Sequence, residues 1–209
     1  MFRFRTLVLV PLVIVAMSRV AIAAPILFTA TLNFAQENNN SLTPSSATGF
    51  ATFELNEAGT ALTWTATVFG IDFNGMQTPG TPADDLTVAH IHRSPAGTNG
   101  PVVWGFVGSP FNDNNPMDVI KTPFASEVGG TVSSKWDAPE GNGLYFGQPV
   151  TLTNQLPSLF NNELYINFHT NQFPSGEVRG QIINTPEPAT LALLGIGIAC
   201  LGLRRKAGH

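Results

Sequence analysis

The chain has 209 residues, of which 43% are hydrophobic and only 11% are charged, with a formal net charge of −4. Residues 24–184 lie between two apolar ends and carry four basic against 13 acidic side chains, a balance of −9. This acidic character argues against nucleic acid as a partner. The only cysteine is Cys200, near the C-terminus, so the middle of the chain has no disulfide and depends on its core, a metal or a partner for stability.

The first 23 residues have the three parts of a secretory signal peptide. Arg3 and Arg5 give a positive start, residues 6–17 are apolar, and Ala21 and Ala23 frame an A-x-A cleavage site. We therefore predict that a signal peptidase removes residues 1–23. An uncleaved N-terminal anchor is the less favoured interpretation, because the apolar region is short.

The middle of the chain shows a strict alternation of apolar and polar residues in several short segments. Residues 26–34, 51–55 and 62–68 alternate in this way, with threonine on the polar face. Period-two patterning in threonine-, aromatic- and branched-residue segments predicts antiparallel strands with one buried face. Further strands are expected at 86–92, 102–107, 128–134, 163–170 and 177–183.

This pattern predicts an all-β domain over residues 24–183, folded as an antiparallel β-sandwich or barrel. Two long loops are expected at 70–85 and 108–122, where binding residues are often found. The leucines of Thr151–Asn162 have helical spacing, so we expect one short helix there, interrupted by Pro157. With its apolar ends included, the whole chain is expected to carry flanking N- and C-terminal hydrophobic helices.

Three histidines of the middle region are the candidate metal ligands. His90 and His92 are two residues apart on an expected strand, so their rings point to the same side. His169 ends another expected strand, on the face that also carries Tyr165 and Asn167. If the three rings converge, they form a site for Zn or Cu. The alternative is that these are structural histidines bonded to the backbone or to polar neighbours.

Charged residues near the end of the middle region have a simpler interpretation. Glu177 and Arg179 lie two apart on the last expected strand, so they share one face. We expect them to point outward as a weak surface ion pair.

The C-terminal segment, residues 184–209, contains a Pro-Glu-Pro triplet, an apolar run and a basic cluster, in that order. The run Ala189–Leu203 has no polar face and is about 15 residues long, short for a permanent membrane anchor. A basic cluster after such a run stays in the cytoplasm. The residues that carry this pattern are Pro186, Glu187, Pro188, Arg204, Arg205 and Lys206.

This tail closely resembles the PEP-CTERM sorting signal of Gram-negative bacteria. The resemblance implies a short transmembrane helix that is held in the inner membrane and cut near Pro186–Pro188 by an exosortase. It further implies release to the cell surface or the extracellular matrix. Whether the tail is removed or retained is left open by the sequence.

The middle region resembles the CHRD domain first described in chordin. The resemblance rests on the segment Ala89–His92, with Gly97 and Gly100–Val103 after it, and on Leu164–Thr170 followed by Phe173–Ile182. It implies a β-rich fold similar to immunoglobulin-like and superoxide-dismutase sandwiches. A two-metal dismutase site is not expected, because three histidines without cysteine cannot supply its ligands.

Two functions fit these observations. The favoured one is a non-enzymatic cell-surface or extracellular-matrix protein whose domain is a structural module or binds a protein or an exopolysaccharide, with no required cofactor. The alternative is a Cu- or Zn-dependent oxidoreductase that uses His90, His92 and His169. Metal analysis of the purified domain distinguishes the two.

Overall fold

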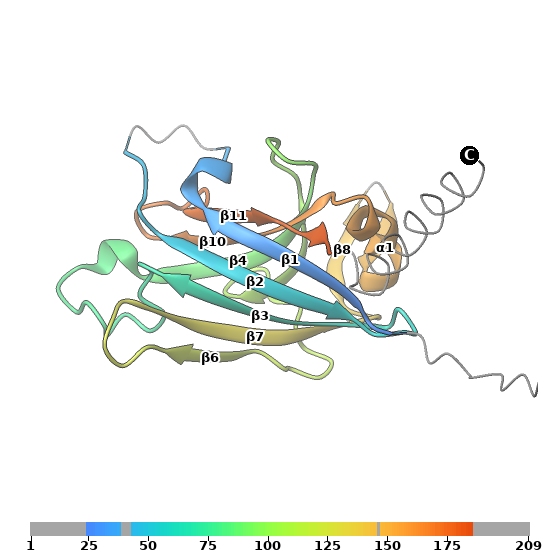
Figure 1. The fold of residues 1–209 in the computed structure, drawn as a ribbon, viewed down its shortest axis with the longest axis horizontal. Coiled ribbons are helices and arrows are strands. Elements are labelled where there is room, and N and C mark those ends of the chain that lie inside the picture. The colour runs from blue at the N-terminus through green and yellow to red at the C-terminus, as the bar shows by residue number, and fades with distance from the viewer. Residues whose placement is uncertain (1–23, 39–42, 146, 186–209) are drawn as a thin grey trace, which may run out of the picture.

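The computed structural model describes residues 24–38, 43–145 and 147–185, and its elements are almost all antiparallel strands (Figure 1). The expected all-β fold is confirmed. The expected flanking helices lie outside the described residues. The elements are β1 (Ile26–Asn33), η1 (Phe34–Gln36), β2 (Thr48–Leu55), β3 (Ala61–Phe69), η2 (Pro82–Asp84), β4 (Leu86–Arg93), β5 (Val102–Val107), β6 (Ile120–Pro123), β7 (Gly129–Asp137), β8 (Gly141–Tyr145), β9 (Gln148–Thr151), α1 (Leu152–Phe160), β10 (Leu164–Thr170), β11 (Val178–Gln181) and β12 (Ile183–Asn184).

One large sheet makes up most of the domain. Its strand order is β5-β4-β10-β11-β1-β2-β3-β7-β6, with β12 also paired to β1, and β8 and β9 form a separate hairpin. The sheet curls, so β10 and β4 lie behind β1, β2 and β3 in Figure 1. Right-handed strand twist, accumulated over so many strands, produces this closure.

Aromatic side chains hold the two ends of the curled sheet together. Trp64 of β3 and Phe106 of β5 have ring centroids 4.5 Å apart, although their strands are far apart in the sheet order. Trp104 of β5 stacks on Trp136 of β7 at 5.5 Å. All four side chains are at most 1% exposed. The core is therefore the interior of the curl, which matches a sandwich or barrel.

The alternating pattern is confirmed most directly in β1, β2 and β3. Along β3 the buried residues Leu62, Trp64, Ala66 and Val68 alternate with threonines that are exposed or half-buried. In β10 and β11, by contrast, every residue is buried. The outer face of these two strands is covered by loops, which the alternation alone does not reveal.

The helix is confirmed, and three strands were missed. Helix α1 runs through Pro157 without a break, so the expected interruption at this residue is wrong. Strand β6 begins at Ile120, inside the expected loop 108–122, and the β8–β9 hairpin follows β7 directly. These strands are short and contain glycine, proline or exposed residues, so they lack the alternation that identifies a strand.

The described chain ends in the sheet. Within β12, Ile183 pairs with Thr29 of β1 and Asn184 pairs with Phe28. The next residue, Thr185, donates its backbone N–H to the carbonyl of Leu27 at 2.9 Å. The last residues before the Pro-Glu-Pro triplet are therefore part of the fold.

Truncating an aromatic side chain at the closure of the curl should cost far more than truncating one on its surface. Phe106→Ala removes a fully buried ring and should lower the free energy of unfolding by about 3–5 kcal/mol. Phe50→Ala, at a side chain that is 48% exposed, is the control and should change it by about 0.5 kcal/mol. Urea denaturation of the exported protein measures both. Equal effects would contradict the assignment of Phe106 to the closing contact.

Candidate metal centre

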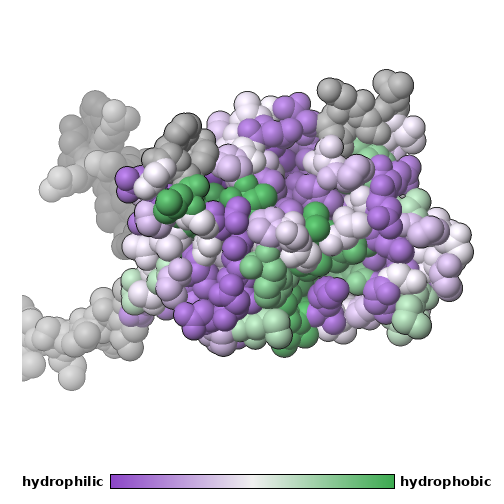
Figure 2. All heavy atoms as spheres, turned by 180° about the vertical axis from the view of Figure 1, so that it is seen from behind, coloured by the Kyte–Doolittle hydropathy of each residue, from purple (hydrophilic) through white to green (hydrophobic). Residues whose placement is uncertain are grey.

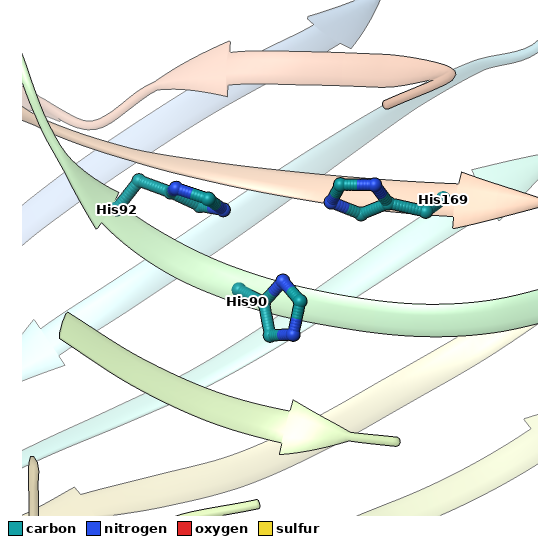
Figure 3. A group of neighbouring side chains, drawn as sticks. All are labelled: His90, His92 and His169. Carbon is teal, nitrogen blue, oxygen red and sulfur yellow. The ribbon is translucent and has the colours of Figure 1, made fainter. Parts of the chain in front are cut away.

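The β4–β10 pair brings the three histidines together. Ala89 and Ile91 of β4 are fully buried in the core, so His90 and His92, which alternate with them, lie on the outer face. Strand β10 runs antiparallel beside β4, and it carries His169 (Figure 3). His90 faces Asn167 across the pair, which is two residues before His169.

The three rings form a compact cluster. Their centroids are 5.5 Å apart for His90 and His92, 5.3 Å for His90 and His169, and 6.4 Å for His92 and His169. One ligand nitrogen from each ring lies within 4.8 Å of the other two. All three histidines are buried: His90 is 4% exposed, His92 is 9% exposed and His169 is 7% exposed. The convergence predicted from the sequence is confirmed.

Each ring is held by one backbone carbonyl. His90 Nε2 donates to Ser109 O at 3.2 Å, His92 Nδ1 to Gly100 O at 2.9 Å, and His169 Nδ1 to Pro174 O at 3.0 Å. A carbonyl only accepts, so these nitrogens carry the proton of the neutral ring. The opposite nitrogens of all three rings then have a free lone pair, and none of them has a hydrogen-bond partner in the protein.

This pattern is the one that metal-binding histidines use. A ligating imidazole donates its other N–H to a carbonyl or carboxylate, which fixes the tautomer and the orientation of the ring. Here three separate loops supply the three carbonyls, after β4, after β5 and after β10.

Burial keeps the three rings neutral. It lowers the pKa of His90 to about 4, helped by the neighbouring His169 and His92, and it lowers the pKa of His92 to about 4. Burial also lowers the pKa of His169, against the opposing effect of its bond to Pro174. Neutral imidazole is the metal-binding form, so the rings need not lose a proton at neutral pH to bind a metal.

A glycine makes room for one ring and the loop above it. Gly105 of β5 lies opposite His90 in the β4–β5 pair. A Cβ atom at Gly105 would lie 1.9 Å from Pro110 O and 3.1 Å from the His90 ring. Only glycine fits at this position, because the loop after β5 crosses the strand there to reach His90.

The predicted surface pair of Glu177 and Arg179 is wrong. Glu177 is 4% exposed and Arg179 is 1% exposed. Glu177 accepts hydrogen bonds from Ser45 and Thr170, both at 2.6 Å, and burial raises its pKa despite them. Arg179 lies in β11 and Glu177 directly before it, and neither side chain is exposed to solvent.

Arg179 instead fastens the loop formed by residues 94–100, here called the 94–100 loop. Its guanidinium donates to Thr98 O at 2.8 Å and to Pro95 O at 3.1 Å. It also lies 3.4 Å from the ring centroid of Tyr165, which stacks on His92 at 4.8 Å. The sequence did not predict the burial of Arg179. The strand order that places β11 beside β10 cannot be read from the alternation of apolar and polar residues.

Tyr165 completes this arrangement. Its hydroxyl accepts from the N–H of Gly100 at 3.2 Å, and the carbonyl of the same Gly100 accepts from His92. The 94–100 loop is therefore held against the sheet at both ends, and it covers the site.

The remaining predicted functional residues lie outside the described part of the chain. These are Ala21 and Ala23 of the signal peptide, and Pro186, Glu187, Pro188, Arg204, Arg205 and Lys206 of the sorting tail. Within residues 24–38, 43–145 and 147–185, no helix is long and apolar enough to cross a membrane.

The fold and the histidine cluster define an all-β domain with a potential three-nitrogen metal site. Residues 28–182 match the CHRD domain, and the chain belongs to the CHRD family. Residues 184–206 match the PEP-CTERM protein-sorting motif. The two matches together indicate an exported protein that is sorted to the cell envelope or surface by exosortase. No curated protein in the comparison matches the chain.

The lowered histidine pKa values predict a pH dependence of stability in the metal-free protein. The unfolded histidines keep their ordinary pKa of 6.5, whereas His90 and His92 in the fold stay neutral down to about pH 4. The unfolded state therefore binds more protons between these two values, and stability falls as the pH is lowered through this window.

Urea unfolding at several pH values between about 7.5 and 4 measures this effect. The double variant His90→Gln and His92→Gln should show a shallower decrease, because it removes two of the groups responsible. Buried carboxyls with raised pKa values contribute the opposite slope in both proteins, so the difference between the two curves isolates the histidines. Parallel curves would contradict neutral, buried rings.

Proposed function

We propose that this exported protein holds a transition-metal ion at the envelope or cell surface, bound by His90, His92 and His169 of its CHRD domain. The observation that carries the proposal is the set of three buried ring nitrogens that point together without a partner. Each unpaired buried polar atom costs about 1–3 kcal/mol. A metal ion offsets all three costs at once, whereas the structural interpretation of the histidines leaves them uncompensated.

The donor set favours Cu or Zn. Imidazole nitrogen suits both ions, and a hard cation such as Ca²⁺ prefers oxygen ligands. The affinity order of divalent metals places Cu²⁺ above Zn²⁺ for a site of given ligands. We therefore propose Cu as the preferred ion in a mixture of equal concentrations, with Zn as the ion bound when Cu is scarce.

The role proposed for the bound metal is to stabilise the fold or to take part in binding a partner, as expected for a non-enzymatic surface module. The ion would join β4 to β10 and, through the carbonyl bonds of its ligands, the loops that cover them. The alternative, a redox enzyme, uses the same three residues. It is favoured by one feature only, the all-imidazole ligand set, which suits copper.

Metal analysis of the purified full chain tests the proposal. The chain should bind one equivalent of Cu²⁺ or Zn²⁺. His92→Gln removes a ligand and should weaken metal binding more than about 100-fold, because mutating only the hydrogen-bond partners of metal ligands already lowers metal affinity about 10- to 100-fold. The fourth histidine of the sequence, His209, provides a matched control, and His209→Gln should leave the affinity unchanged. Equal affinities of the two variants would contradict the site.

A second proposed role is binding of a protein or an exopolysaccharide. The rear face is mostly polar, with an apolar band near its centre (Figure 2). A groove of about 410 Å³ next to α1 is lined by apolar residues, Pro149, Val150 and Pro157, and by polar side chains that can bond to hydroxyl groups, those of Arg93, Gln148, Thr153, Asn154 and Gln155. Within it, Gln155 is 2% exposed and its Oε1 has no partner in the protein. These features favour a hydrated, hydroxyl-rich partner over a large apolar one.

Delivery to the surface is proposed to pass through an inner-membrane intermediate, held by residues 189–203. In this state Arg204, Arg205 and Lys206 stay on the cytoplasmic side, because moving each across the membrane costs about 2.5–3.5 kcal/mol. Proline disfavours helix at itself and at the residue before it, so the Pro-Glu-Pro triplet is expected to be extended and accessible to the protease.

Replacing Pro186, Glu187 and Pro188 by alanine should therefore leave the protein uncut in the inner membrane. Mass spectrometry of the membrane and surface fractions measures the C-terminal residue of each form. The double variant Pro174→Ala and Pro149→Ala, which changes prolines outside the tail, is the control for loss of proline as such and should be processed normally. A surface form of the wild type that still ends at His209 would contradict removal of the tail.

A further inference from the structure

The ligand nitrogens of the histidine cluster are closed off from solvent. His90 Nδ1, His92 Nε2 and His169 Nε2 are all buried. A metal ion therefore reaches them only when a segment that covers them moves. Three segments supply the carbonyls that bond to the rings, and they are the candidates for this movement: the 94–100 loop, the loop between β5 and β6, and the turn between β10 and β11.

The loop between β5 and β6 is anchored in the interior of the protein. The side chain of Asp113 is fully buried, and it accepts hydrogen bonds from the hydroxyl of Ser134 and from the backbone N–H of Asp118. Asn112 donates its backbone N–H to Gly105 O at 2.7 Å, and its side chain accepts from Gly105 N–H at 2.9 Å. Moving this loop would break a buried hydrogen-bond network.

The turn between β10 and β11 is anchored as well. Phe173 is 6% exposed, and its ring packs edge-on against Phe34, with the ring centroids 5.5 Å apart. Glu177, at the end of the turn, is buried and hydrogen-bonded to Ser45 and Thr170. Moving this turn would expose an aromatic ring and pull a buried carboxyl away from its donors.

The 94–100 loop is anchored differently. Pro95–Asn99 are all exposed, and Ser94 and Gly100 are half-buried, so the loop places no buried side chain in the protein. It is held by hydrogen bonds, and water can replace these when the loop lifts, so that their net loss is small. Its carbonyls accept from Arg179 and Gln181, its Asn99 donates to Asn38 O, and its Gly100 N–H donates to Tyr165.

Arg179 is the residue that connects the closed loop to the cluster. Its guanidinium donates to two carbonyls of the loop and lies 3.4 Å from the ring centroid of Tyr165. Tyr165 stacks on His92, and His92 donates to the carbonyl of Gly100 in the same loop. When the loop lifts, His92 loses the carbonyl that fixes its ring. Opening the loop thus uncovers the site and releases one ligand in a single movement.

We propose that the 94–100 loop is the lid through which the metal ion enters and leaves, and that Arg179 holds this lid closed. The inference rests on the proposed metal site, and it adds an entry route and a residue that controls exchange. The metal is bound in the closed state, which remains the major one. Arg179 therefore sets how often the site opens, so that its loss speeds binding and release together and leaves the affinity nearly unchanged.

Gly97→Ala tests the lid without touching a ligand. Gly97 has a φ of +78°, and a Cβ atom there meets nothing within 4 Å, so alanine strains the closed loop without a clash. The rates of Cu²⁺ binding and release should both rise about tenfold. The Kd should change less than about threefold. Gly143→Ala in β8 is the matched control, with a φ of +66° and equally open surroundings, and should exchange Cu²⁺ as the wild type does.

Rapid mixing of the full chain with Cu²⁺ measures binding through quenching of tryptophan fluorescence. Excess EDTA measures release, at concentrations where the rate no longer depends on EDTA. Unchanged rates in Gly97→Ala would overturn the lid and leave the metal site intact. A wild-type chain that binds no Cu²⁺ would overturn the metal site, and the inference with it.

Arg179→Lys tests the residue that holds the lid. Lysine keeps the charge but lacks the planar fork that donates to two carbonyls at once. Binding and release of Cu²⁺ should again both become faster, with little change in Kd. Faster release with a proportional loss of affinity would overturn this role, because Arg179 would then position the ligands instead of controlling the lid.

Hydrogen exchange of the metal-free chain gives a measurement that depends on neither Cu²⁺ nor Arg179 variants. The Gly100 N–H should exchange through a local opening that urea does not promote. The Asn112 N–H, in the loop between β5 and β6, should exchange more slowly. Gly97→Ala should speed exchange at Gly100 and leave Asn112 unchanged. Exchange of both amides only through global unfolding would overturn the lid.

Discussion

The register between β4 and β10 is the constraint on which the candidate site depends. Because side chains alternate along a strand, a slip of one residue would turn His169 and Asn167 into the core and bring Phe168 out. Burial on both sides opposes such a slip, since Ile91 and Ile166 face each other on the inner side while Tyr165 faces His92 on the outer side. The same apolar residues that form the core thus set the relative positions of the polar ones.

The loops complete what the strands begin. A flat pair of strands would leave the histidines in water, with ordinary pKa values and mobile rings. The 94–100 loop, the loop after β5 and the turn after β10 each cover the face, and each has a carbonyl that accepts a hydrogen bond from one ring. Arg179 supports the first of these loops from a neighbouring strand. Charged and polar side chains therefore have a structural role here, because they hold the covering loops in place.

Much of this arrangement could be predicted from local patterns, and the part that could not depends on contacts between distant segments. Period-two alternation located β1, β2 and β3, and the spacing of His90 and His92 placed them on one side. Burial of Arg179 was not predictable, because alternation says which residues share a face but not what covers that face.

The way the chain leaves the domain has a consequence for its processing. Ile183, Asn184 and Thr185 are bonded to the sheet or to the turn after α1, and Pro186 comes next in the sequence. A protease cutting before residue 186 would have to peel the last strand from β1, at the expense of its backbone hydrogen bonds. Folding thus limits where a protease can cut the chain. The new C-terminus left by a cut after residue 185 stays hydrogen-bonded to β1.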